Sequence, residues 1–233
     1  LWMLVREPLR VTERGMAPAP VKGDVVRQIL SRKKMYLGLF FTCSFAAGCT
    51  SGLLYWSMES LKRDFGWSAV EAGSAFGPII LVASVVGVMG APWITARVRA
   101  RGRMDAVILV TAVFLAVACV SLAFGPMLSD PHLRLAVLGL GLTGSVGGGL
   151  NIVVSMQEVA PARMRGTFVA LLYMGNTILG AGASPVLIPT VGGLSDAIGL
   201  SGGLAIVGAS LTGTGVLLLC WIRSAFEREA IAG

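Results

Sequence analysis

Long apolar stretches separated by short polar stretches dominate the chain. Windows without a charged side chain run over residues 35–57, 72–94, 106–128, 135–157, 167–190 and 200–222. A helix needs about 20 apolar residues to cross the hydrocarbon core of a bilayer, and a helix satisfies its own backbone hydrogen bonds there. The roughly ten-residue alternation typical of membrane β-strands is absent. The pattern therefore predicts an all-α membrane protein with six transmembrane helices.

The composition agrees with a membrane protein. Hydrophobic residues make up 55% of the chain and charged residues 13%, with a mean hydropathy of +0.79, whereas soluble domains carry roughly 25% charged residues. The four cysteines lie inside apolar windows without metal-ligand spacing, and His132 is the single histidine. We therefore expect no metal and no other cofactor. Hydrolase, metalloprotease and P-loop motifs are absent, so we do not expect an enzyme.

Basic residues are distributed unevenly between the two sides of the predicted membrane. Six spans place residues 1–34, the connections after the second and fourth spans, and residues 223–233 on one side. That side holds sixteen of the nineteen Lys and Arg residues, and only Lys62, Arg63 and Arg134 lie on the other. Basic loops favour the cytoplasm, so we expect both ends of the segment to be cytoplasmic, in the plasma membrane of a bacterium. The same bias explains the net charge of +7, and we expect no nucleic-acid partner.

The first 34 residues differ from the rest of the chain. LWMLV at 1–5 resembles the end of an earlier apolar helix, and REPLR then begins a basic linker that contains Pro and Gly. We divide the chain into a preceding helix end with a central cytoplasmic linker (1–34), a six-helix bundle (35–222) and a cytoplasmic tail (223–233). The chain looks like the second half of a longer protein, whose N-terminal six-helix half would be its partner. A complete six-span protein that dimerises is the alternative.

Small and polar residues follow one helical face in four of the six spans. In the fourth span Gly144, Gly148, Asn151, Ser155 and Glu158 recur at the spacing of one face. Similar faces carry Ser44, Gly48, Ser51 and Tyr55 in the first span, Gly73, Gly77, Ser84, Gly87 and Ala91 in the second, and Tyr173, Asn176 or Thr177, Gly180 and Ser184 in the fifth. The third span is bulky and lacks glycine, as a lipid-facing support helix would. Such a stripe is either a packing seam or the lining of a wet pathway, and the spacing leaves both open.

A charged connection joins the fourth and fifth spans. Glu158 lies about one turn before the end of the fourth span, and Arg163, Arg165 and Gly166 follow. No Asp, Glu, Lys or Arg lies deep in a predicted span, so the sequence shows no proton or ion relay there. Glu158 is either an ion-pair partner of a nearby arginine or a proton carrier. We favour the ion pair, and expect it to form in one conformation and to break in another, as a gate requires. The candidate partners are Arg97, Arg163 and Arg165.

Five stretches carry motifs that occur together in one transporter family. They are REPLR at 6–10, YWSMESLKRDFGWSAVEAG at 55–73, GVMGAPWITARVRARGRMD at 87–105, QEVAPARMRGTFVAL at 157–171 and GNTILGAGASPVLIPTVGGLSDAIG at 175–199. In this order they resemble the end of helix 6, the 7–8 loop, the 8–9 loop, the 10–11 loop with its P-x-x-x-R-G motif, and helix 11 of a major facilitator superfamily transporter. The 8–9 loop lacks the acidic residue of the family's G-x-x-x-D-R-x-G-R motif. The chain thus resembles the C-terminal six-helix half of the twelve-helix major facilitator fold.

The resemblance implies a mechanism and a set of site residues. Two six-helix halves rock about a midplane site, and helices 7, 8, 10 and 11 contribute to the cavity while helices 9 and 12 lie outside it. The last two motifs and REPLR favour the spinster-like branch, whose members move amphipathic lipids or organic anions. The substrate-cavity candidates are Ser51, Tyr55, Ser84, Asn151, Ser155, Tyr173, Asn176 and Thr177. The cytoplasmic gate candidates are Arg97, Glu158, Arg163, Arg165 and Gly166.

These observations predict half of a secondary active transporter among membrane lipids, with a small amphipathic or organic-anion substrate. A non-transporting six-span receptor or scaffold is an alternative, although it would need an output domain or an interaction loop and every loop here is short. An intramembrane enzyme would need paired catalytic side chains at matched depth, and the sequence shows none.

Overall fold

The protein is built from helices. The computed structural model describes residues 22–103, 105–194 and 198–232. In chain order the elements are α1 (Lys22–Ser31), α2 (Lys33–Phe65), α3 (Ala69–Ala100), α4 (Ala106–Phe124), η1 (Gly125–Met127), α5 (Pro131–Val159), η2 (Ala162–Met164), α6 (Arg165–Gly175), η3 (Asn176–Ala181), α7 (Ser184–Gly192) and α8 (Gly199–Ala232). The first 21 residues, where the sequence predicts a helix end and most of a linker, lie outside the described residues.

Six segments of the described chain are long and apolar enough to cross a membrane. They are Lys33–Phe65, Ala69–Ala100, Ala106–Met127, Pro131–Val159, Ala162–Gly192 and Gly199–Arg223. The predicted all-α fold with six spans is therefore confirmed. Most of the helices run beyond the charge-free windows, and α8 continues through the predicted tail to Ala232.

Local sequence signals define several helix ends. Ser68 begins α3 with a capping box, in which its hydroxyl accepts from the Glu71 amide and the Glu71 carboxylate accepts from the Ser68 amide. Gly66 ends α2 with a φ of 69°, a left-handed conformation that glycine adopts without strain. Asp130 caps α5 by accepting from the Leu133 amide at 2.7 Å. Because the connections are short, each span reverses the direction of the span before it.

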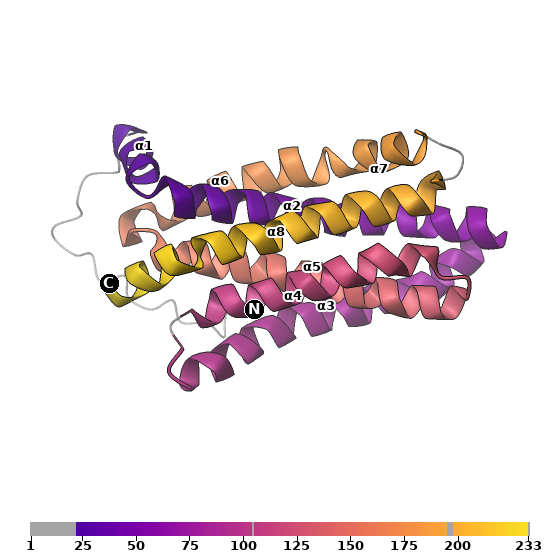
Figure 1. The fold of residues 1–233 in the computed structure, drawn as a ribbon, viewed down its shortest axis with the longest axis horizontal. Coiled ribbons are helices and arrows are strands. Elements are labelled where there is room, and N and C mark those ends of the chain that lie inside the picture. Colours follow the sequence, from indigo (N-terminus) through magenta and orange to yellow (C-terminus); the bar gives the residue numbers. More distant parts are fainter. Residues whose placement is uncertain (1–21, 104, 195–197, 233) are drawn as a thin grey trace, which may run out of the picture.

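The spans lie side by side along one axis (Figure 1). Helices α2, α5, α4 and α8 form a ring in which each contacts the next, while α3 packs on α5 and the fifth span packs on α2 and α8. Only 22% of the apolar window of α3 is buried, against 56% for α2 and for α5. The flanking spans therefore present most of their surface outward. Helix α4, expected to be a lipid-facing support, is packed between α5 and α8 and keeps an exposed stripe that includes Val113, Val117 and Val120.

Close helix contacts depend on glycine. A Cβ at Gly180 would lie 2.5 Å from the Ser44 carbonyl oxygen, and one at Gly87 would lie 2.8 Å from the Thr143 carbonyl oxygen. Lipid tails are as apolar as leucine, so spans associate through close packing rather than through hydrophobic burial. The glycines of the predicted polar faces thus serve helix contact at these positions.

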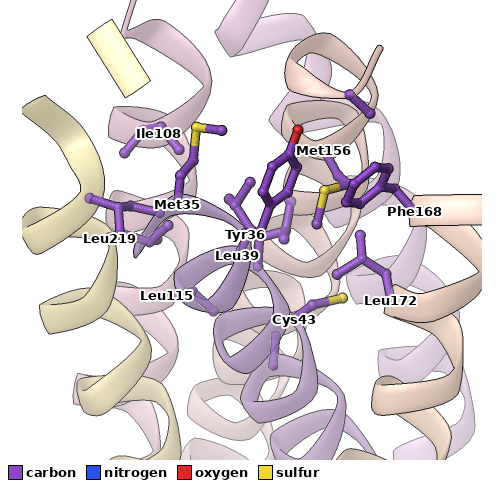
Figure 2. Packing of buried hydrophobic residues seen from close by; sticks show 14 of the residues in the cluster. Met35, Tyr36, Leu39, Cys43, Ile108, Leu115, Met156, Phe168, Leu172 and Leu219 are labelled. Atoms are coloured by element: carbon purple, nitrogen blue, oxygen red, sulfur yellow. The ribbon is translucent and has the colours of Figure 1, made fainter. Parts of the chain in front are cut away.

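One end of the bundle carries most of the described cations and a compact core. We call it the basic end, and define it by α1, the α3–α4 and α5–α6 connections and the C-terminal part of α8; the opposite end, with Asp64, is the Asp64 end. Figure 2 shows the core at the basic end, where the rings of Tyr36 and Phe168 stack with centroids 4.5 Å apart, beside Met35 and Met156. This core joins the start of α2 to the connection between the fourth and fifth spans.

Candidate functional site

A hollow lies between α2, α5 and the fifth span, close to the middle of all three. Its volume is about 260 Å³, and its lining residues are Cys43, Ala46, Ala47, Thr50, Ser51, Ser145, Val146, Gly149, Leu150, Val153, Tyr173 and Asn176. We call it the central hollow. Its polar groups are hydroxyls and one amide, and no Asp, Glu, Lys, Arg or His is among the lining residues. The hollow can therefore form hydrogen bonds with a ligand but supplies no formal charge.

The polar groups of the central hollow fall into two sets. Thr50 Oγ1 lies 3.0 Å from Ser145 Oγ, and Ser145 Oγ donates to the Leu142 carbonyl at 3.2 Å, so these hydroxyls bond one another and the backbone. The side chains of Ser51, Tyr173 and Asn176 make no hydrogen bond with another described residue. Their donors and acceptors are available to a ligand.

The fifth span changes its winding where it meets the hollow. Asn176 opens the π-helix η3, and the Gly182 amide then donates to the Thr177 carbonyl, five residues back. Short π-helical segments occur frequently at functional sites. Farther along, Pro189 has no amide for the Pro185 carbonyl, and Trp56 Nε1 donates to that oxygen at 3.2 Å. The first turn of α7, which follows η3, is thus held to α2 by a specific hydrogen bond.

Three of the predicted cavity residues, Ser51, Tyr173 and Asn176, line the central hollow. Tyr55 is 65% exposed and lies one turn beyond Ser51, outside the lining. The Thr177 hydroxyl donates to the Tyr173 carbonyl at 2.9 Å. Helix α3, which carries the candidate Ser84, contributes no residue to this hollow.

The remaining two cavity candidates, Asn151 and Ser155, are buried between helices. Asn151 Nδ2 donates to Thr95 Oγ1 at 3.0 Å, and the Ser155 hydroxyl donates to the Asn151 carbonyl at 2.9 Å. The first bond joins α5 to α3, and the second lies within α5. On the same stripe, Gly144 and Gly148 face α4, where added Cβ atoms would meet backbone or side-chain atoms. The stripe therefore packs against neighbouring helices, which is one of the two possibilities that its spacing leaves open.

The face of α5 that lines the hollow lies beside that stripe. Ser145 and Gly149 lie next to the stripe, and Val146, Leu150 and Val153 lie farther round the helix, on the side opposite the predicted polar face. Sequence reasoning missed Ser145, although the serine directly follows Gly144 in a glycine-rich run. Helical spacing identifies such faces but does not say which one meets the neighbouring span.

A second hollow continues along the same face of α5. Its volume is about 400 Å³, and it is lined by Pro78, Ile79, Val82, Ala83 and Val86 of α3 and by Ala136, Gly139, Leu140 and Thr143 of α5. We call it the apolar groove. Leu140 and Thr143 precede Val146 and Leu150 at spacings of three or four residues, which places them on one face. A polar hollow and an apolar groove therefore follow one another along α5.

The gate candidate Glu158 forms an ion pair at the basic end, but with a different arginine from those expected. Arg99 Nη2 lies 2.7 Å and 2.9 Å from the two carboxylate oxygens of Glu158. The pairs expected with Arg97, Arg163 and Arg165 do not form in this structure, where the guanidinium of Arg97 lies 3.8 Å over the Trp93 ring, on another side of α3; pairing in another conformation stays a prediction.

The other gate candidates lie in the connection that follows Glu158 or at the start of α6. Arg165 Nε donates to the Ala160 carbonyl at 3.4 Å and thereby closes the turn between α5 and α6. Arg163 and Gly166 are exposed on the same connection. The Arg99–Glu158 pair links the ends of α3 and α5, and its side chains are 46% and 31% exposed, so water reaches both groups.

A buried carboxylate also organises the basic end. Asp105 accepts from Arg103 Nε and Nη2 at 3.1 Å and 3.0 Å, and Arg223 Nη2 lies 2.6 Å from the same carboxylate. Hydrogen bonds from Arg103, followed by the charge of Arg223, hold the pKa of Asp105 below its usual range despite its burial. This acid was not singled out from the sequence, and it ties the α3–α4 connection to α8.

The Asp64 end is closed by a buried arginine. Arg134 Nη1 donates to Asp64 Oδ2 at 2.5 Å, and Arg134 Nε donates to the Leu128 carbonyl at 3.0 Å. Ser201 Oγ donates to the same Asp64 oxygen at 2.5 Å. The network joins α2, α5 and α8 at the end of the bundle that is poor in cations.

The geometry describes a polytopic α-helical membrane protein with an uncharged hollow at mid-span and ion pairs at both ends. The family model of the Major Facilitator Superfamily matches residues 1–185. The chain therefore belongs to this superfamily, as the sequence motifs predicted. Its transporters bind small molecules and are generally not enzymes.

Solved transporter structures share the fold. A bacterial homologue of the human lysosomal transporter spinster, inward-facing and unoccupied, matches with a TM-score of 0.63 at 17% identity, over 98% of this chain and 55% of that chain. The same homologue in its inward-facing, occupied conformation matches with a TM-score of 0.56 at 17% identity, over 99% and 54%. The chain thus spans about half the length of these transporters, which confirms the predicted six-helix half. No curated protein matched the sequence.

Proposed function

We propose that the chain acts as the C-terminal half of a secondary active transporter, which moves a small substrate by alternating access together with an N-terminal six-helix half. The central hollow carries this proposal, because three spans surround it near their midpoints. Transporters built from repeated halves bind their substrates near the bilayer midplane, at the interface between the halves. Membership of the superfamily supports the same function.

The chemistry of the lining favours an amphipathic substrate. Ser51, Tyr173 and Asn176 offer neutral hydrogen-bonding groups, while the apolar groove continues along α5. An organic anion would have to find its counter-charge in the other half, because no Lys or Arg lines either hollow. A substrate with a neutral polar group and an apolar part therefore fits the described residues better.

Uptake into vesicles that contain the full-length protein tests the substrate site. Amphipathic compounds and organic anions would be screened with and without a proton gradient. Once a substrate is found, Asn176→Leu should raise its KM by about five- to tenfold, which corresponds to one lost hydrogen bond of about 1 kcal/mol, and should leave the unfolding temperature unchanged. Asn151→Leu is the matched control, since Asn151 bonds Thr95 inside a seam; it should lower the unfolding temperature and leave KM unchanged. Equal effects of both variants on both quantities would refute the assignment.

We further propose that the Arg99–Glu158 pair is a gate on the cytoplasmic side. The sixteen-to-three distribution of cations supports this orientation, and the exposure of both side chains lets the pair open at low cost. Glu158→Gln and Arg99→Gln should each change the transport rate, and the charge-reversed double variant should restore it in part. Arg97→Gln is the control because Arg97 packs on Trp93. Wild-type rates in both single variants would exclude a gating role.

A further inference from the structure

Helix α1 carries an exposed apolar face at the basic end. Val26 is 56% exposed and Leu30 is 64% exposed, and their spacing of four residues places them on one face of the helix. The neighbouring face, about 100° around the helix, is docked, because Val25 and Ile29 pack against the core of the basic end. The helix is thus anchored along one face while two large apolar side chains beside that face remain uncovered.

Hydrogen bonds fix the docked face of α1. Gln28 Nε2 donates to the Tyr36 hydroxyl at 3.4 Å, and that hydroxyl donates to the Val159 carbonyl at 3.4 Å. The ring of Tyr36 also stacks on Phe168 (Figure 2). The position of α1 is therefore set by α2 and by the connection between the fourth and fifth spans.

The orientation of α1 places the helix at the level of the membrane surface. The helix breaks at Arg32, whose φ is −129° and ψ is 37°, and α1 is turned across the long axis along which the spans run (Figure 1). The charge-free part of α2 begins directly after Lys34. Because the spans follow the membrane normal, α1 lies across that normal at the level where the hydrocarbon ends.

Two exposed tryptophans lie beside cations in the half of the bundle that contains the basic end. Lys34 Nζ lies 5.6 Å from the centre of the Trp221 ring, and Arg97 lies over the Trp93 ring on another span. Both tryptophans are more than half exposed, and tryptophan is enriched where the membrane meets water. Arg27, Lys33 and Lys34 are also exposed.

The local charge favours an anionic partner. Residues 22–34 contain five Lys or Arg residues and one Asp, a net charge of +4. Residues 1–21 contain three Arg and two Glu residues, a net charge of +1, and so offer no complementary charge. A leaflet with anionic lipids supplies both the negative charge and the apolar environment that this face requires.

We propose that α1 binds the membrane surface, with Val26 and Leu30 at the boundary between headgroups and acyl chains. Arg27, Lys33 and Lys34 contact the phosphates of anionic lipids. Each cation near an anionic leaflet strengthens such binding by about fivefold. This surface is independent of the substrate site and of the proposed gate.

Hydrogen–deuterium exchange of the full-length protein in nanodiscs tests the proposal. The α1 amides should exchange more slowly in phosphatidylcholine that contains phosphatidylglycerol than in phosphatidylcholine alone. In the triple variant Arg27→Gln, Lys33→Gln and Lys34→Gln the difference should disappear, and added salt should reduce it in the wild type. Arg101→Gln, which removes an exposed cation from the end of α3, is the control and should retain the difference. Exchange in α5 of the same samples reports that the bundle is folded.

Two results would overturn the proposal. Equal exchange of α1 in both lipid compositions would show that lipid charge plays no part, and that protein rather than the leaflet covers this face. A lipid-dependent difference that persists in the triple variant would show that the named cations do not bind the phosphates. The double variant Val26→Ser and Leu30→Ser separately tests the apolar contribution, and unchanged protection in it would also contradict the proposal.

Discussion

The ion pair between Asp64 and Arg134 is asymmetric, because its two members differ in exposure. The Arg134 side chain is 6% exposed and the Asp64 side chain is 34% exposed. The guanidinium also donates to the Leu128 carbonyl and lies 4.5 Å over the Phe65 ring. Removing the acid leaves a buried cation without its counter-charge, whereas removing the cation leaves a carboxylate that water reaches. We therefore expect Asp64→Asn to be more destabilising than Arg134→Met.

The size of each destabilisation follows from the charged and polar groups that remain after the substitution. Breaking a buried pair by removing one partner costs about 3–5 kcal/mol, and Asp64→Asn should lie near the lower limit, about 3 kcal/mol, because carbonyl and hydroxyl acceptors still surround Arg134. Arg134→Met retains an unbranched side chain at the helix junction, and the Asp64 carboxylate that remains is reached by water and keeps the hydrogen bond from Ser201, so we expect a cost of about 1 kcal/mol. At about 2–4 °C per kcal/mol for a chain of this size, the unfolding temperature should fall by about 6–12 °C and about 2–4 °C respectively.

Thermal unfolding in detergent with a thiol-reactive dye measures both shifts. Cys43 and Cys49 are buried and unpaired, so the dye reports exposure of the interior. Arg63→Gln is the control, since the Arg63 side chain is 61% exposed in its pair with Glu59, and the loss of such a surface pair should shift the unfolding temperature little. A larger shift for Arg134→Met than for Asp64→Asn would refute the assignment of the cost to a buried, uncompensated cation.

Substitutions test three further contacts elsewhere in the bundle. Asp105→Asn should cost about 1–3 kcal/mol near neutral pH; because the Asp105 pKa is depressed, its contribution is full above about pH 4 and is lost as pH falls through the lowered pKa. Gly180→Ala should lower stability by about 1–3 kcal/mol, whereas Gly77→Ala, with open space around it, should not; unfolding temperatures measure both. Trp56→Phe should speed amide exchange in α7, because the Pro185 carbonyl loses its donor.

Each of these expectations has a contrary result. An Asp105→Asn cost that is undiminished below about pH 4 would mean that the cost does not come from the paired carboxylate. Equal changes in unfolding temperature for Gly180→Ala and Gly77→Ala would show that α2 makes room for the added methyl group without a cost in stability. Unchanged exchange of α7 in Trp56→Phe would show that its first turn does not depend on the indole.

The sequence predicted the number and order of the spans because each has a charge-free window of sufficient length. It underestimated the lengths of the helices, because charged residues beyond the apolar windows remain helical. Helix α2, for example, continues to Phe65 through Glu59, Lys62 and Arg63, which pair at spacings of three and four residues. At 33 residues it is about 50 Å long, well beyond the hydrocarbon thickness of about 30 Å. The hydrophobic window indicates the part of the helix that lies in the hydrocarbon, and the helix itself extends beyond that part.

The site was less accessible to sequence reasoning because it depends on which helix faces meet. Gly144 and Asn151 share a face with Glu158, yet the hollow is lined by the next face, which begins at Ser145. Successive residues of a helix are about 100° apart, so periodicity groups residues into faces. It does not say which of two adjacent faces lines a hollow, because that depends on how closely α4 approaches. The partner of Glu158 was missed for the same reason: the expected Arg97 and the observed Arg99 leave α3 in different directions.

The two ends of the bundle differ in how readily their ion pairs can separate, and this difference bears on the proposed transport cycle. At the Asp64 end, buried Arg134 joins α2, α5 and α8, and its pair costs several kcal/mol to break. At the basic end, the pair that links α3 to α5 is exposed on both sides and contributes about 0–1 kcal/mol. A reversible opening must separate the ion pair that costs less free energy to break. We therefore expect any internal motion of this half to separate α3 from α5 at the basic end, while the Asp64 end moves as one body around the central hollow.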